Sequence, residues 1–230
     1  MSIGLNEIIT ALLTGALPTL IWLWFWLSED KAKPEPKLIL ALVFVIGALS
    51  VLVAIPLQQV MAGIFESTVS LSYIVSSAGI EEILKFGLVG LFLALTPFAD
   101  EPIDYAIYFI TGALGFAAFE NMLYLANPIL HIFAADTITI SSLRFLGSTL
   151  LHAVMGAILG LLLGLVWKKS RRAQVGMFLG GLFLVTALHS VFNHFIINSS
   201  THAVFAVLAT LWVIAILLLY AFERIKYIHR

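Results

Sequence analysis

Long apolar stretches, separated by short polar segments, run through almost the whole chain. A helix needs about 20 mainly apolar residues to cross a bilayer. Seven stretches are close to this length, at residues 8–27, 38–57, 68–95, 103–126, 143–167, 174–197 and 203–221. This pattern predicts an all-α fold: a polytopic integral membrane bundle of about seven transmembrane helices that forms a single domain over residues 1–230.

Composition supports this prediction and argues against several other classes of protein. The chain has 230 residues, of which 61% are hydrophobic and only 11% are charged, whereas a soluble domain carries about 25% charged residues. The net charge of −1 gives no support to nucleic-acid binding. The absence of cysteine excludes disulfide bonds and thiolate metal sites.

Basic residues are concentrated in three segments, and these segments predict the orientation of the bundle. Ten of the twelve Lys and Arg residues lie there: Lys31, Lys33, Lys37, Lys168, Lys169, Arg171, Arg172, Arg224, Lys226 and Arg230. With seven spans, all three segments fall on the same side of the membrane. Because cytoplasmic loops are enriched in Lys and Arg, we expect the N-terminus outside the cell and the C-terminus in the cytoplasm.

Six ionisable or amide side chains interrupt the apolar stretches: Glu81, Glu82, Glu120, His152, His189 and Asn193. An acidic residue at membrane depth costs about 3 kcal/mol, and it persists mainly where it pairs, binds an ion or reacts. In the predicted orientation the three glutamates and two histidines lie at similar depths, roughly 10–20 Å below the outer surface at 1.5 Å per residue. We therefore expect four helices to bring them together, within a core bundle at about residues 68–197.

Residue spacing and charge indicate how the negative charge of such a site is neutralised. Lys85 lies three residues after Glu82 and four after Glu81, so its ammonium group can reach either carboxylate on one helix face. Three carboxylates against one lysine leave an excess of negative charge, which a shared proton or a cation must meet. A divalent metal bound by His152, His189 and a glutamate would meet it, because histidine and carboxylate ligands suit zinc. A Glu82–Lys85 ion pair that only fixes helix packing is the structural alternative.

Four segments, in this order, resemble the motifs of the PrsW-type intramembrane proteases, which are relatives of the CAAX-processing and abortive-infection membrane proteases. The matching residues are Glu81–Lys85 (EExxK), Gly112–Asn121 (a glycine-rich segment containing FxxxE), Arg144 with His152, and His189 with Asn193 (HxxxN). Glu120 stands where the CAAX relatives carry histidine, which favours the PrsW branch. One departure is that Tyr105 follows Asp104, where family members often have Asp-Gly.

The resemblance implies hydrolysis of a peptide bond in a membrane-anchored protein, such as an anti-sigma factor, near the extracytoplasmic side of a prokaryotic cell membrane. It supports a metal centre with a divalent ion, such as zinc, on Glu120, His152 and His189. We expect Glu81 or Glu82 to act as the general base and Lys85 to orient that carboxylate. Asn193 would donate a hydrogen bond to the developing oxyanion or hold His189 in its tautomer, and Arg144 would lie near the outer mouth of the site.

Other interpretations remain open from the sequence. A metal-free glutamate protease, similar to the CAAX-processing enzymes, would activate water with a carboxylate and a neighbouring group. A proton- or cation-coupled transporter would also contain buried carboxylates, although transporters usually show internal repeats and none is evident here. A non-catalytic membrane adaptor is a third possible interpretation of the sequence. The partners expected for a protease are a membrane-anchored protein substrate and the lipid bilayer, with no nucleic acid.

Overall fold

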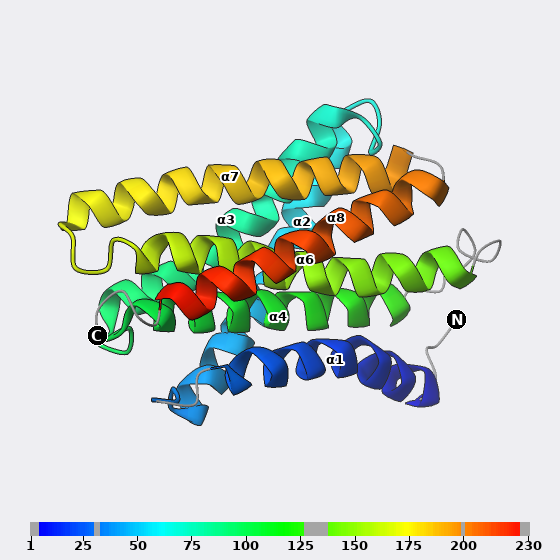
Figure 1. Ribbon diagram of the computed structural model, residues 1–230. Helices are drawn as coiled ribbons and strands as arrows, with labels where there is room; N and C mark the ends of the chain where they lie inside the picture. Colours follow the sequence, from blue (N-terminus) through cyan, green and yellow to red (C-terminus); the bar gives the residue numbers. More distant parts are fainter. Residues whose placement is uncertain (1–4, 30–32, 127–137, 199–200, 226–230) are drawn as a thin grey trace.

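The computed structural model describes residues 5–29, 33–126, 138–198 and 201–225, with side chains described in 15–29, 33–124, 147–198 and 202–225. All regular structure in these ranges is α-helical (Figure 1). The helices are α1 (Leu5–Ser28), α2 (Lys37–Ile64), α3 (Leu71–Leu95), α4 (Pro102–Ala126), α6 (Ile138–Gly164), α7 (Arg171–Asn198) and α8 (Thr201–Ile225). The predicted all-α class is confirmed.

The helices have the length and the surface of membrane spans. Five described segments are long and apolar enough to cross a bilayer: Lys37–Ile64, Pro102–Tyr124, Gly147–Gly164, Arg171–Asn198 and His202–Ile225. α3 is equally long but carries three charged residues in its middle. Large apolar side chains such as Phe183 on α7 and Leu217 on α8 point outward. This surface fits a polytopic bundle surrounded by lipid.

α4 and α6 pack together along the centre of the bundle, with α1 on one side and α7 on the other (Figure 1). Glycines on α6 allow this close approach. A Cβ atom on Gly156 would lie only 2.7 Å from the carbonyl oxygen of Phe109, and one on Gly160 would overlap the backbone of Ala106. Because small residues let membrane helices approach closely, His152, one turn before Gly156, is brought onto the face of α6 that packs against α4.

α2 extends further than the sequence predicts. Its predicted end at residue 57 is wrong, because the helix continues past Gln58 to Ile64. The polar pair Gln58 and Gln59 marks the end of the apolar stretch in the sequence. In the structure, however, Gln58 points towards α3, where it donates hydrogen bonds to Ser77 and Glu81. The last two turns of α2 are therefore part of the bundle.

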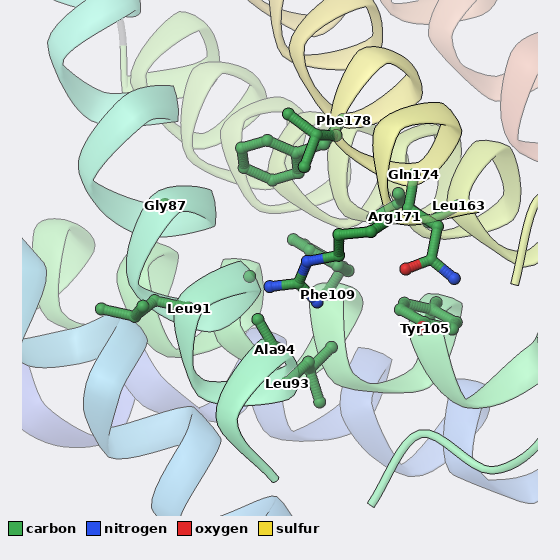
Figure 2. A pocket seen from close by; sticks show the side chains of 12 residues that line it. Gly87, Leu91, Leu93, Ala94, Tyr105, Phe109, Leu163, Arg171, Gln174 and Phe178 are labelled. Carbon is green, nitrogen blue, oxygen red and sulfur yellow. The ribbon is translucent and has the colours of Figure 1, made fainter. Parts of the chain in front are cut away.

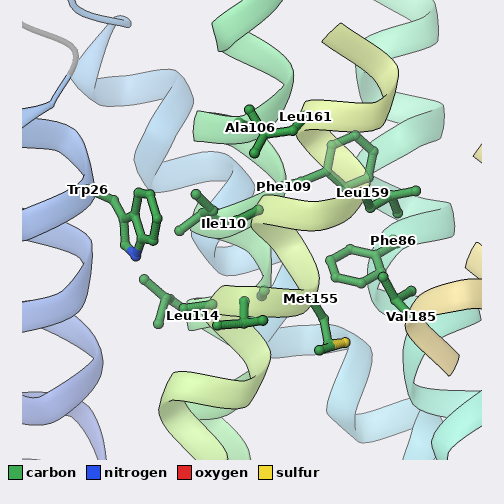
Figure 3. Packing of buried hydrophobic residues seen from close by; sticks show 14 of the residues in the cluster. Trp26, Phe86, Ala106, Phe109, Ile110, Leu114, Met155, Leu159, Leu161 and Val185 are labelled. Carbon is green, nitrogen blue, oxygen red and sulfur yellow. The ribbon is translucent and has the colours of Figure 1, made fainter. Parts of the chain in front are cut away.

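Aromatic and aliphatic side chains from all seven described helices form the core beside the charged turn of α3, and Figure 3 shows part of this cluster. Phe86 of α3 packs against Phe109 of α4, with ring centroids 5.6 Å apart, and Met155 and Val185 extend the same cluster from α6 and α7. Phe86 directly follows Lys85 in the chain. The core thus anchors the turn of α3 that presents Lys85 to its neighbours.

The connection between α3 and α4 is fixed by its own hydrogen bonds. The Asp104 carboxylate accepts hydrogen bonds from the backbone N–H groups of Asp100 (2.8 Å) and Glu101 (2.6 Å), and Pro102 occupies the first position of α4, where proline is favoured. Tyr105 is already helical. The departure from the family's Asp-Gly pair therefore lies in the first turn of α4, at the opposite end of that helix from Glu120.

Candidate functional site

Five of the predicted ionisable side chains, with Lys85, form one buried cluster between four helices. α3 provides Glu81, Glu82 and Lys85, α4 provides Glu120, α6 provides His152 and α7 provides His189. Most of them are excluded from solvent: Glu82 and Lys85 are 0% exposed, and Glu81 is 5% exposed. The Glu120 side chain is 37% exposed and lies at the rim. The predicted meeting of separate helices at one level is present in the structure.

Lys85 is the centre of the cluster. Its ammonium group donates to Glu82 Oε1 at 2.8 Å and to Nδ1 of His152 at 3.0 Å. It also lies 4.6 Å and 5.0 Å from the ring centroids of Phe86 and Phe116, and such contacts stabilise a desolvated cation. The sequence allowed Lys85 to pair with either glutamate, and the structure selects Glu82.

His152 connects Lys85 to the rim of the site. Because an ammonium group can only donate hydrogen bonds, Nδ1 of His152 accepts from Lys85. The proton of the neutral ring is then on Nε2, which donates to Glu120 Oε2 at 3.0 Å. Lys85 and His152 thus form a hydrogen-bonded relay from the buried Glu82 to the more exposed Glu120.

His189 has the opposite tautomer. Its Nδ1 lies 2.7 Å from Glu82 Oε1 and donates to that carboxylate. The lone pair of the neutral ring is therefore on Nε2, which lies 3.7 Å from Glu81 Oε2. A carboxylate that holds the far nitrogen of a histidine is the usual arrangement behind a metal-binding imidazole, because it fixes the tautomer and the orientation of the ring.

The donor set of this cluster fits a cation. Glu81 Oε2 and Glu82 Oε2 are buried and accept no hydrogen bond within the described residues. The lone pairs of Glu81 Oε2 and His189 Nε2 face each other, and such an arrangement requires a proton or a cation between them. Two overlapping groups have ligand atoms that all lie within 4.8 Å of one another: Glu82, His152 and His189, and Glu81, Glu120 and His152.

The predicted ligand set of Glu120, His152 and His189 is divided between these two groups, which share His152. In the arrangement described, His189 Nε2 is free to bind a metal, whereas His152 Nε2 donates to Glu120. Ligation by His152 would therefore require loss of the Nε2 proton, since histidine binds metals through a deprotonated nitrogen.

A cavity of about 170 Å³ opens beside Glu120, His152 and His189. Its other lining residues come from α4, α6 and α7: Asn121, Tyr124, Ser148, Phe192, Asn193, Ile196 and Ile197. Asn193 therefore lies where the sequence predicts it, at the wall beside His189, and it is half-buried. The side chain of Arg144 lies outside the described residues. The cavity leaves space for solvent beside the rim of the cluster.

Sequence reasoning missed two polar contacts at the site. Gln58 of α2 donates from Nε2 to Glu81 Oε1 at 2.6 Å and to Ser77 Oγ at 2.8 Å. Asn121 donates to Thr149 Oγ1 at 3.0 Å, which ties α4 to α6 directly beside Glu120 and His152. An amide at the end of an apolar stretch is the available signal for Gln58, but only the packing of α2 on α3 shows its partner.

Comparisons with known proteins show what the chain is similar to. A family described as PrsW family intramembrane metalloprotease matches residues 35–221. Protease PrsW of Geobacillus kaustophilus (strain HTA426) is 30% identical over 185 residues, which cover 78% of this chain and 76% of that relative. Protease PrsW of Oceanobacillus iheyensis is 27% identical over 212 residues, 90% of this chain and 94% of the relative.

Protease PrsW of Bacillus subtilis (strain 168) is 27% identical over 200 residues, which cover 84% of this chain and 85% of that relative. No solved structure matches the chain significantly. The similarities extend over all the helices that build the cluster. They favour the protease interpretation over a transporter.

Proposed function

Because the chain belongs to the PrsW family of intramembrane metalloproteases, we propose that its glutamate–histidine cluster hydrolyses a peptide bond of a membrane-anchored protein, such as an anti-sigma factor. The hydrogen-bonded chain from Glu82 through Lys85 and His152 to Glu120 carries this proposal, together with the free Nε2 of His189. Such a buried, charged network on four helices is costly in a membrane, and catalysis is a common reason for its presence.

Glu81 is the general base in this proposal. Its Oε2 atom accepts no hydrogen bond within the described residues and lies beside His189 Nε2, so it is available to take a proton from water. Glu82 has a different role because its Oε1 atom already accepts from Lys85 and His189. Glu82 and Lys85 thus orient the histidines.

His189, His152 and Glu120 would hold the divalent metal once His152 Nε2 has lost the proton that it donates to Glu120, and zinc suits this donor set. A metal at this place supplies Lewis-acid activation of water and of the scissile carbonyl group. The protein residues contribute the rest: Glu82 fixes the tautomer of His189, and Glu81 accepts the proton of the attacking water. Glu81 can then return this proton to the leaving amine, as general acid–base catalysis requires.

The cavity beside the cluster is the proposed position of the scissile segment. Asn193 lines it next to His189, where an amide N–H group can donate to the oxyanion that develops on the carbonyl oxygen. In the predicted orientation, α3 begins at the outer surface, and Glu81 lies ten residues after Leu71, about 15 Å along the helix axis. Cleavage would therefore occur in the extracytoplasmic half of the membrane.

The decisive experiment is cleavage of a tagged single-span protein by the purified protein in liposomes, with bound metal measured in parallel. Glu81→Gln should abolish cleavage but keep the metal, whereas His189→Ala should lose both. Glu82→Gln should weaken metal binding by about 10- to 100-fold, the usual effect of removing a carboxylate behind a histidine ligand. A chelator should inhibit the wild type, and added zinc should restore it.

His194→Ala is the matched control, because His194 is on the same helix as His189 but bonds to Asn198 outside the cluster. This variant should cleave like the wild type. Full cleavage by Glu81→Gln and His189→Ala would refute the protease site. Cleavage that survives stringent chelation, with no metal in the protein, would refute the metal and leave the metal-free glutamate mechanism.

Orientation can be tested because the chain contains no cysteine. Ser67→Cys introduces an exposed thiol between α2 and α3, and Ser170→Cys introduces one between α6 and α7. With the N-terminus outside, an impermeant thiol reagent should label the first variant in intact cells and the second only after lysis. The reverse labelling pattern would invert the proposed topology.

A further inference from the structure

A second cavity lies between α3, α4 and α7, away from the glutamate–histidine cluster (Figure 2). It has a volume of about 230 Å³ and a mainly apolar lining that includes Leu91 and Ala94 of α3 and Phe178 of α7. Empty space lies next to Gly87 in the wall of the cavity, since a Cβ atom on this residue would meet no other atom within 4 Å. The cavity is thus a mainly apolar slot between membrane helices.

Arg171 places a positive charge over this slot. Figure 2 shows its side chain crossing the cavity from the beginning of α7 towards α3. Within the described part of the chain, none of the ion pairs involves Arg171. Lys168, Lys169 and Arg172 surround it in sequence. A guanidinium group binds phosphate with paired hydrogen bonds, so the slot combines an apolar interior with an anion-binding group.

We propose that this cavity binds one anionic phospholipid, with its phosphate on Arg171 and one acyl chain along Gly87 and Leu91. Basic pockets between membrane helices on the cytoplasmic side are typical binding sites for anionic headgroups. The predicted topology places Arg171 on that side. A lipid seated there would contact both α3 and α7, and it would therefore hold together the helices that carry Glu81 and His189.

Position separates this cavity from the proteolytic site. Arg171 and His189 lie 18 residues apart on α7, which is roughly 27 Å along the helix axis. The Gly87 end of the cavity is closer, two residues after Lys85, but no residue lines both cavities. A substrate segment in the cavity beside His189 would therefore leave the Arg171 cavity free. Lipid binding can accordingly be measured independently of cleavage.

The test uses the full-length protein, delipidated in a neutral detergent, and measures binding of dioleoylphosphatidylglycerol by native mass spectrometry. Dioleoylphosphatidylcholine is the neutral lipid control, and glycerol phosphate tests the headgroup alone. The wild type should bind one phosphatidylglycerol at least tenfold more tightly than phosphatidylcholine, because only the former adds a net negative charge at Arg171. Glycerol phosphate should bind much more weakly, because it lacks the acyl chain.

Two pairs of variants separate a specific site from general attraction to basic residues. Arg171→Gln should weaken phosphatidylglycerol binding about tenfold, the effect of losing one charge-assisted contact, whereas Arg172→Gln should change it less than twofold. Gly87→Leu should abolish tight binding by filling the slot. Gly176→Leu should have no effect, because a Cβ atom there also meets nothing within 4 Å but Gly176 does not line the cavity.

Equal losses in Arg171→Gln and Arg172→Gln would overturn the proposal, because they would indicate non-specific charge attraction. Unchanged binding by Gly87→Leu would overturn it as well, since the acyl chain would then lie elsewhere. Equal affinities for phosphatidylglycerol and phosphatidylcholine would also overturn the proposal. If the single-span substrate displaces phosphatidylglycerol from the wild type, the slot is a substrate contact and not a lipid site.

Discussion

The contact between Gln58 and Glu81 allows a quantitative test of the site. Replacing Gln58 by leucine keeps a side chain of similar size but removes the amide that donates to Glu81 Oε1 at 2.6 Å. A hydrogen bond to a charged group contributes about 1.5–3 kcal/mol. If Gln58 holds the base in position for proton transfer, this range corresponds to roughly a 10- to 150-fold loss of kcat/KM.

Cleavage of the single-span protein in liposomes would measure this effect, with kcat and KM determined separately across the pH range. We expect the loss to fall mainly on kcat and the pH profile to shift, because the amide acts on the base and not on the cavity that receives the substrate. Gln59→Leu is the control, since Gln59 is the exposed neighbour on the same helix. Its activity should remain within twofold of the wild type.

A double-mutant cycle on unfolding distinguishes a direct contact from a general disturbance of α2. Gln58→Leu and Glu81→Gln should show a coupling energy in the 0.5–3 kcal/mol range that is typical of residues in contact. Additive effects of the two substitutions would contradict the contact. An unchanged kcat and pH profile in Gln58→Leu would refute the role assigned to the amide, even if the contact itself exists.

Two further predictions concern the packing around the site. Lys85→Met should reduce the free energy of unfolding by about 3–5 kcal/mol, because it leaves the buried Glu82 without its cation; combining it with Glu82→Gln should recover part of this loss, and a denaturant titration in detergent would detect both changes. Gly115→Ala should cost about 1–3 kcal/mol by overpacking, since its Cβ atom would overlap the carbonyl oxygen of Phe44 on α2. Gly63→Ala should cost nothing in the same titration, because open space surrounds that position, and equal losses in both would contradict the helix contact.

The helices can be predicted from the sequence because a membrane-spanning helix needs a minimum length of apolar residues. Prediction from apolar length fails where a polar side chain forms hydrogen bonds inside the bundle, because the helix then continues past the apolar stretch. The stretch ending at residue 57 stops too early because hydropathy treats Gln58 as solvated, whereas its amide is satisfied by α3. Tertiary contacts that compensate a polar residue lie on another helix, and no property of the local sequence shows them.

Candidate site residues are identifiable for a related reason. Glutamates and histidines in apolar stretches are costly, so their presence alone marks Glu81, Glu82, Glu120, His152 and His189 for attention. Their individual bonds are not identifiable in this way. Spacing on α3 permits Lys85 to pair with either neighbouring glutamate, and the choice depends on which face of α3 points towards His152.

That choice determines the chemistry available at the site. Lys85 meets His152 of α6 and Glu82 together, which leaves Glu81 on the other side of the ion pair, beside His189 and Gln58. One glutamate is consequently neutralised and orients the imidazoles, while the other keeps an oxygen without a hydrogen-bonding partner among the described residues. Two adjacent glutamates thus differ in their contacts because different helices pack against them. Glu81 can act as a base because Glu82 binds the lysine and leaves Glu81 Oε2 without a hydrogen bond among the described residues.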